Sequence, residues 1–297
     1  MFVLIGFGVV ITSVIVGYLW EHGNLSLLYQ PAEFVIIAGG ALGGMLIASS
    51  PKIARTILHG LKSIMTSKPY GRQDYVVLLM MANDLFLKIR REGLRSLEAE
   101  LDKPLESRFF GRYPNFVQNR HALFLLTDVF RTISTTKLEG HHLEALLDSD
   151  IEAYHEELMV SSKSIAHMAD SLPGLGIVAA VLGVVITMQK INEPPDVLGH
   201  SIGAALVGTF LGVLLAYGFV GPLALKLENI ANEEREYLNV LKAIIVSFVN
   251  GVHPQIAVEF GRMLIPDSAR PSFMEIDEMI RQAKVIAGKQ ESAKGKA

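Results

Sequence analysis

Two regions of this sequence consist of long apolar runs that are almost free of charged side chains. Lysine and arginine are absent from residues 1–50, and between residues 171 and 225 the charged residues are Lys190, Glu193 and Asp196. A charged residue at the centre of a bilayer costs about 2.5–3.5 kcal/mol on insertion scales. Apolar runs of this kind therefore predict segments that lie in lipid.

Four segments within these regions reach the roughly 17–25 residues that a helix needs to cross a bilayer. They cover about residues 2–20, 32–49, 171–190 and 198–225. The sequence thus predicts an all-α membrane protein with four transmembrane helices, two early and two late. The N-terminus has no basic stretch and no A-x-A-like cleavage site, so we expect the first run to be retained as a span.

The remaining sequence is charged, with apolar residues at helical spacing, and predicts a large helical cytoplasmic domain. The last residues are small and polar, a composition typical of disorder. We expect spans three and four to continue as long helices beyond the membrane, and one helix over residues 75–101. The predicted division is 1–50 (spans one and two), 51–170 (cytoplasmic helices), 171–225 (spans three and four), 226–286 (helical tail) and 287–297 (disordered).

Basic residues predict the orientation, because cytoplasmic flanks of spans carry an excess of lysine and arginine. Lys52 and Arg55 follow the second span, and Lys226 and Arg235 follow the fourth. The loop of residues 21–33 has no basic residue. Both termini and the central domain are therefore expected in the cytoplasm, in a multi-pass protein of the bacterial inner membrane.

Composition excludes several function classes. The net charge of −3 gives no electrostatic basis for nucleic-acid binding. The chain has no cysteine, which rules out disulfides and thiolate metal sites. It also lacks Walker, G-x-S-x-G and H-E-x-x-H motifs. The pair His141–His142 lacks a convincing partner at i,i+3 or i,i+4, and we interpret it as a surface pair and not a metal site. We expect no enzyme activity, no cofactor and no metal.

The central stretches of spans three and four contain no ionisable side chain. If Glu33 is assigned to the loop before the second span, neither the early nor the late pair of spans carries a carboxylate. Transporters of protons usually have a titratable group at membrane depth. Either the helices only anchor the protein, or a partner supplies a membrane-embedded carboxylate.

Small residues mark one face of each late span. On span three they are Pro173, Gly176, Ala180, Gly183 and Thr187, and on span four Ala205, Gly208, Thr209, Gly212 and Ala216. Such faces let helices approach closely in lipid. Simple helix packing explains each motif alone, whereas several small faces in one chain favour an oligomer.

A few polar residues and prolines are candidates for more than packing. Pro173 and Pro222 lie at the cytoplasmic ends of spans three and four, where they either end helices harmlessly or relay motion. Thr209 is the best polar candidate inside span four, although such hydroxyls often bond to their own helix; Tyr217 lies nearer the end. The charged residues 88–100 form either a solvated helix face or a docking surface for a protein.

Several longer motifs resemble one family. They are LYQPAEFVIIAGG at 28–40, DSLPGLGIVAAVLGVV at 170–185, VGTFLGVLLAYGF at 207–219, IAVEFGR at 256–262 and RPSF at 270–273. The chain resembles, over almost its whole length, the MotA family of flagellar motor stator proteins, within the MotA/TolQ/ExbB proton channel superfamily. The resemblance implies a ring, a pentamer, around a dimer of the single-span protein MotB, whose membrane aspartate binds the ion.

The resemblance also implies roles for individual residues. Pro173 and Pro222 match the family's functional prolines, and Thr209 matches a hydroxyl that faces the ion path. Ala180 stands where sodium-driven relatives have threonine, which implies that the coupling ion is the proton, because a missing hydroxyl removes a ligand for a hard cation. In this reading Tyr217 also belongs to the ion path.

Arg90 and Glu98 match the charged pair that faces the rotor protein FliG. The sequence thus predicts a flagellar stator subunit that converts ion flow into torque. One rival is an ExbB- or TolQ-like energiser, against which the early pair of spans argues, since those relatives usually have three spans. The other rival is a scaffold that conducts no ions.

Overall fold

The computed structural model describes residues 2–136 and 140–282, and every regular element in those two ranges is a helix. The predicted disordered tail, 287–297, lies outside the described residues. The chain divides into two compact units. The first contains Met1–Ser67 and Glu156–Ala231, and the second contains Lys68–His155 and Asn232–Ala297. The sequence-based boundaries at 50, 170 and 225 mark expected membrane surfaces, and they stay a prediction.

The first unit holds the candidate spans. Its helices are α1 (Phe2–Trp20), α2 (Leu25–Leu28), α3 (Pro31–Ala48), α4 (Pro51–Thr66), residues 156–188 of α9 (Gly140–Met188), α10 (Pro195–Leu214), the π-helical segment η3 (Leu215–Val220) and residues 221–231 of α11 (Gly221–Val249). Within the described residues, four helices are long and apolar enough to cross a membrane. The predicted all-α architecture with four spans is therefore confirmed.

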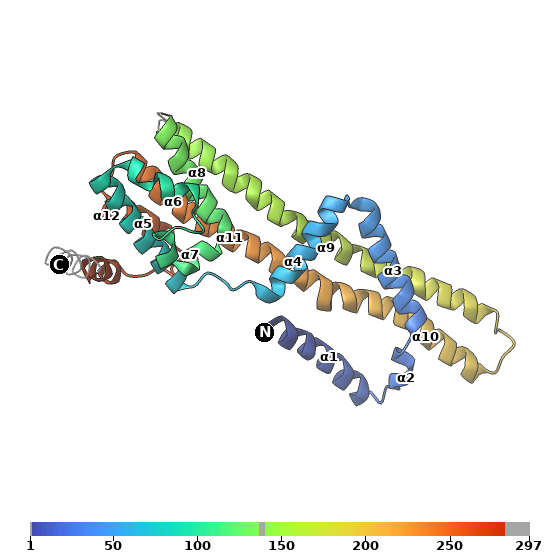
Figure 1. Cartoon of the computed structure of the whole chain (residues 1–297). Helices are drawn as coiled ribbons and strands as arrows, with labels where there is room; N and C mark the ends of the chain where they lie inside the picture. The colour runs from blue at the N-terminus through green and yellow to red at the C-terminus, as the bar shows by residue number, and fades with distance from the viewer. Residues whose placement is uncertain (1, 137–139, 283–297) are drawn as a thin grey trace. The chain divides into compact units, whose positions relative to one another are not determined.

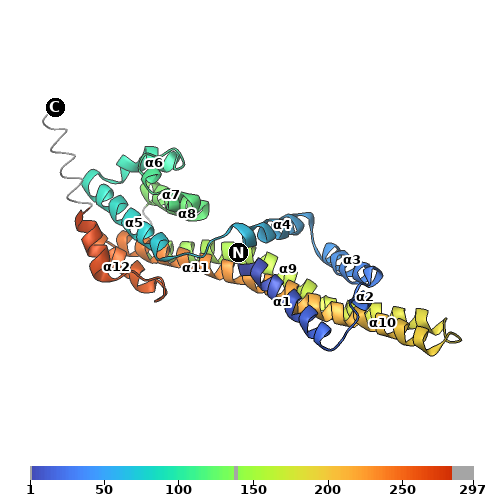
Figure 2. The same ribbon diagram turned by 90° about the horizontal axis from the view of Figure 1, so that it is seen from below.

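The late spans are parts of much longer helices, as the sequence predicted. Helix α9 has 49 residues, and α10, η3 and α11 follow one another without a loop. In this unit α9 and α10 run side by side (Figures 1 and 2). The early helix α3 packs on them, because a β-carbon added at Gly40 would lie 2.8 Å from Leu175 of α9.

Helix α4 is fixed to the same unit through polar side chains. Ser50 caps its N-terminus by accepting a hydrogen bond from the amide of Ile53. The Ser161 hydroxyl of α9 donates to the carbonyl of Thr56 at 2.9 Å, and Gly60 lies against Ser161. In the same region the Ser162 hydroxyl donates to the carbonyl of Ala224 in α11 at 2.8 Å.

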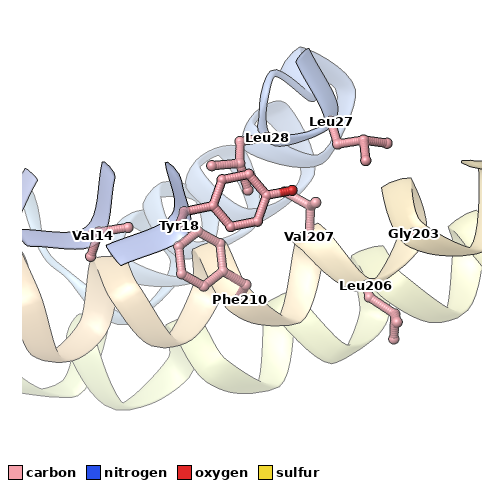
Figure 3. Close-up of a pocket in the computed structure, with 8 residues that line it drawn as sticks. All are labelled: Val14, Tyr18, Leu27, Leu28, Gly203, Leu206, Val207 and Phe210. Carbon is pink, nitrogen blue, oxygen red and sulfur yellow. The ribbon is translucent and has the colours of Figure 1, made fainter. Parts of the chain in front are cut away.

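An apolar pocket of about 410 Å³ lies between α1, α2 and α10. Figure 3 shows the Tyr18 ring of α1 beside Phe210 and Val207 of α10, with Leu28 of α2 close by. The other side chains of α1 are mostly exposed, and none of them is buried. For a helix in lipid, this means that α1 offers its surface to lipid or to other helices.

The second unit has its own hydrophobic core. Its helices are α5 (Arg72–Glu92), η1 (Leu94–Leu97), α6 (Glu98–Asp102), η2 (Phe110–Arg112), α7 (Pro114–Gln118), α8 (Arg120–Thr135), α12 (Pro254–Leu264) and the adjoining parts of α9 and α11. Phe86 stacks on Phe248 with ring centroids 3.9 Å apart, and Phe130 packs against both rings. Aromatic packing of this kind holds α5, α8 and α11 together.

A half-buried polar network completes this unit. Glu234 of α11 accepts a hydrogen bond from the Tyr70 hydroxyl at 2.6 Å and another from the Asn119 side chain at 2.7 Å. Asn119 is also the N-cap of α8, where it accepts from the amide of Ala122. Burial and the neighbouring carboxylate raise the pKa of Tyr70, so the phenol stays protonated and keeps donating.

The predicted single helix over 75–101 is wrong. Helix α5 ends at Glu92, and Gly93 follows with φ of +81°. Its amide donates to the carbonyl of Ile89, which closes the last turn. Glycine is the residue that adopts this left-handed backbone at low cost, so the chain turns here and begins α6 at Glu98.

Candidate functional site: the seam between α9 and α10

The small faces of the late spans meet, as their placement predicted. A β-carbon added to Gly212 would lie 2.6 Å from the carbonyl oxygen of Leu172 and 2.9 Å from the Cα of Gly176. One added to Gly183 would lie 2.7 Å from the β-carbon of Ala205. These backbones therefore touch along a seam, which we define as Leu172–Gly183 of α9 and Ala205–Gly212 of α10.

The seam brings two of the three predicted ion-path residues together. Ala180 is buried, and its amide nitrogen would lie 3.0 Å from a β-carbon on Gly208, the neighbour of Thr209. The Cα of Thr209 lies against Gly176. Ala180 and Thr209 thus both lie along the seam, Ala180 against Gly208 and Thr209 against Gly176.

The Thr209 hydroxyl differs from the hydroxyl of Thr187. Thr187 is buried, and its hydroxyl donates to the carbonyl of Gly183 at 2.9 Å. A threonine hydroxyl inside a helix commonly makes this bond to the carbonyl four residues earlier. Thr209 is half-buried, and among residues 2–136 and 140–282 its hydroxyl has no such bond. Because the Thr209 hydroxyl makes no hydrogen bond to its own helix, it remains able to bind a proton carrier or water.

The sequence-based statement that neither pair of spans carries a carboxylate is wrong. Glu33 is the third residue of α3, not part of the preceding loop, and lies within the second candidate span. Its side chain is 8% exposed and reaches the seam, since a β-carbon on Gly208 would lie 2.7 Å from Glu33 Oε2. The signal was present: the Q-P-A-E sequence places Pro31 at the first helical turn, where proline starts helices.

The two predicted coupling prolines both lie inside helices. Pro173 is in α9, where it cannot donate to the carbonyl of Ala169, and Pro222 is in α11, where it cannot donate to the carbonyl of Gly218. Next to Pro222 the helix widens into η3, in which the Gly221 amide bonds to the carbonyl of Ala216. This π-helical segment accommodates the missing bond, and the sequence analysis did not predict it.

Tyr217, the third predicted ion-path residue, lies apart from Ala180 and Thr209. It belongs to η3, is 74% exposed, and lines a pocket of about 220 Å³. Asp170 and Glu228 line the same pocket, as do Ala169 and Gly221 beside the two prolines. The structure thus places Tyr217 with the prolines rather than with the seam.

Arg90 and Glu98 are exposed and lie on different helices of the second unit, α5 and α6. Neither forms an ion pair in the described part of the chain. Their neighbours are used internally: Lys88 lies 3.6 Å from Glu100, which also accepts bonds from the Ser107 hydroxyl and the Phe109 amide. Arg90 and Glu98 are therefore exposed, opposite charges that no ion pair in the described residues occupies.

Comparison with known proteins defines the class. Residues 4–93 match the model described as Motility protein A N-terminal, and residues 118–239 match the MotA/TolQ/ExbB proton channel family. Two solved structures share the fold: "Structure of C. jejuni MotAB" (TM-score 0.75, 18% identity, 91% of this chain and 98% of that chain) and the flagellar MotAB stator complex from Bacillus subtilis (TM-score 0.70, 22% identity, 89% and 95%). The chain therefore falls in the class of MotA/TolQ/ExbB proton channel proteins.

Curated relatives show the particular family. The chain is 40% identical to Motility protein A of Escherichia coli and 38% identical to that of Salmonella typhimurium, each over 96% of both chains. It is 30% identical to the chemotaxis protein LafT of Vibrio parahaemolyticus over 92% of this chain. The chain belongs to the Motility protein A family. It is a flagellar stator subunit and not an enzyme, and the ExbB- or TolQ-like and scaffold hypotheses are set aside.

Proposed function

We propose that this chain forms a ring, a pentamer, around a dimer of a MotB-type single-span protein in the bacterial inner membrane. Proton flow through the complex turns the ring and drives the rotor protein FliG. The observation that carries the proposal is the seam, where stretches of α9 and α10 without charged residues bring together Ala180 and a Thr209 hydroxyl that has no hydrogen bond among the described residues. A path of this kind needs a carboxylate on a facing helix, which the partner's membrane aspartate supplies.

Exposed apolar surface supports an assembly. No residue of α1 is buried, and α9 exposes Ile177, Val181 and Val185 at spacings of four residues. Exposed apolar surface of this kind suits contact with a neighbouring transmembrane helix as well as with lipid. Lys52, Arg55 and Lys226 flank the spans on the side that we assign to the cytoplasm, together with both termini.

The coupling ion in this proposal is the proton. Ala180 offers no oxygen at its position along the seam, and a bound sodium ion needs several oxygen ligands. A proton needs one acceptor at a time. Other cofactors have no role in the mechanism.

Motion starts at the prolines. When the partner's aspartate is protonated or released, α9 and α11 bend at Pro173 and Pro222, where the helices already lack hydrogen bonds. Tyr217 and the pocket around it accommodate the change in distance between α9 and α11. Arg90 and Glu98 then act on oppositely charged residues of the rotor.

Proton uptake by liposomes tests the proposal. Liposomes that contain this chain with its MotB-type partner are expected to acidify inside when a potential is applied, equally with and without sodium. The matched control is the same complex with the partner's membrane aspartate changed to asparagine. An intact complex that conducts nothing contradicts the proposal, and uptake that requires sodium contradicts the assignment of the ion.

A further inference from the structure

Glu33 is a carboxyl group in the membrane that the mechanism above does not use. It is the one charged residue of α3. The side chain is 8% exposed, and its Oε2 atom has no hydrogen-bond partner among the residues that the structure describes. Buried polar atoms almost always have a partner, so an unpartnered carboxyl oxygen in this position requires an explanation.

The carboxyl group fits a space that glycine provides. A β-carbon on Gly208 would lie 2.7 Å from Glu33 Oε2, and one on Gly183 would lie 3.7 Å from Oε1. Any larger residue at position 208 displaces the carboxyl group. Glu33 is therefore inserted between α9 and α10, next to Ala180 and one residue from Thr209.

The surroundings of Glu33 contain no positive charge to balance a carboxylate. From Ser171 to Met188, α9 has no ionisable residue, and α10 has only Asp196 and His200, both in its first two turns. Glu33 has no ion pair in the described ranges, with their gaps at 1, 137–139 and 283–297. An unpaired carboxylate in an apolar site costs several kcal/mol, and the group avoids that cost by holding a proton.

We propose that Glu33 is a proton-binding site of the stator that feeds the ion path at the seam. The O–H bond of the Glu33 carboxyl breaks as its proton passes to the partner's membrane carboxylate, which becomes the neutral acid. The Glu33 carboxylate then takes a proton from a hydronium ion on the periplasmic side, which leaves a water molecule; the start of α3 lies on that side in the proposed topology. The role of Glu33 in proton transfer rests on the proposed function. The protonation of Glu33 does not.

Glu33→Gln is the decisive variant, because glutamine has almost the same size and cannot release a proton. In the assembled complex with its partner, proton uptake by liposomes is expected to fall about a hundredfold, at the low end of what a positioned proton donor contributes. Glu33→Asp keeps a proton carrier and is expected to conduct at an intermediate rate. Glu21→Gln, an exposed acid in the preceding loop, is the matched control and is expected to conduct as wild type.

Infrared spectroscopy tests the bound proton independently of flux. Labelling glutamate with carbon-13 shifts the carbonyl band of a protonated glutamate, but not that of the partner's aspartate. We expect a shifted band in the wild-type complex at neutral pH and none in Glu33→Gln. Absence of the band from the wild type overturns the proposal, as does wild-type uptake by an assembled Glu33→Gln complex. If the wild-type complex conducts nothing, the proposed function fails, and the infrared band alone decides whether Glu33 holds a proton.

Discussion

At the scale of the residue, the closest approach in the seam depends on glycine. Gly212→Ala places a methyl group 2.6 Å from the carbonyl oxygen of Leu172, and backbone atoms on both sides leave it no room. Overpacking of this kind typically costs about 1–3 kcal/mol. We expect a lower melting temperature of the detergent-solubilised complex and slower swimming.

The matched control for this substitution lies on the same helix. A β-carbon on Gly203 meets no atom within 4 Å, so Gly203→Ala makes the same change of helix propensity without a clash. Gly203→Ala is expected to keep the wild-type melting temperature or raise it slightly. Equal effects of the two variants would show that the seam is not closely packed in the assembled protein.

Glu100 predicts a pH dependence of stability in the second unit. Burial alone raises the pKa of this carboxyl, but bonds from the Ser107 hydroxyl, the Phe109 amide and Lys88 outweigh it and lower the pKa. Because the folded-state pKa lies below the unfolded value of about 4.3, the stabilisation is complete above that value and is lost as the pH falls through the folded one.

Glu100→Gln is therefore expected to cost about 1–3 kcal/mol at neutral pH and to flatten the fall in stability on acidification. Melting temperatures measured from neutral to acidic pH give both the loss of stability at neutral pH and its change on acidification. Glu106→Gln is the control, because Glu106 is exposed and its pair with Lys103 is at the surface. A Glu100→Gln profile parallel to that of wild type refutes the assignment.

At the scale of the element, Pro222 and the π-helical segment act together. Pro222→Ala restores a donor for the carbonyl of Gly218, and a proline inside a helix costs about 3 kcal/mol relative to alanine. We expect the variant to melt at a higher temperature, to show slower amide exchange around η3, and to swim poorly because the helix bends less readily.

Pro195→Ala provides the control for the proline. Pro195 lies in the first turn of α10, where its missing donor breaks no helical bond. Swimming is expected to be unchanged in this variant. A Pro222→Ala strain that swims at wild-type speed would remove Pro222 from the coupling mechanism.

The elements differ in how far the sequence determined them. The spans and the long helices were predictable, because uncharged length and helical spacing are local signals. Gly93 was not recognised as a helix end, since an isolated glycine in a helical pattern is compatible with both outcomes. The π-helical segment depends on how the backbone accommodates Pro222, which residue types alone do not specify.

The candidate site was predictable in part for the same reason. Ala180 and Thr209 lie on small faces whose meeting follows from spacing. The location of Glu33 could not be derived this way, because its burial depends on Gly183 and Gly208, which are far away in the sequence. Tyr217 lies on the π-helical segment, beside the pocket near the prolines, and its role in the ion path stays a prediction.

At the scale of the whole molecule, Arg90 and Glu98 predict how the stator engages its rotor. Both are exposed, so reversing either charge is expected to change stability by less than about 0.5 kcal/mol. Arg90→Glu or Glu98→Lys is nevertheless expected to slow swimming, and reversing a charge on the rotor is expected to restore part of the speed. Measuring both swimming speed and melting temperature distinguishes a lost contact with the rotor from a loss of folding stability.

Arg91→Glu is the control for the charge reversals, because Arg91 is an exposed neighbour on the same helix. It is expected to swim faster than Arg90→Glu. If neither single reversal slows swimming, and Arg90→Glu with Glu98→Lys also swims as wild type, this surface does not contact the rotor through these charges.

The position of Glu33 has a consequence for how the protein is made. The ribosome delivers α3 to the membrane long before the glycines that receive its carboxyl group have been synthesised. Until α9 and α10 arrive, Glu33 must remain near the lipid headgroups, where water can solvate it. The early spans therefore reach their final packing only after the last span is inserted. Burial of Glu33 thus accompanies the completion of the folded subunit.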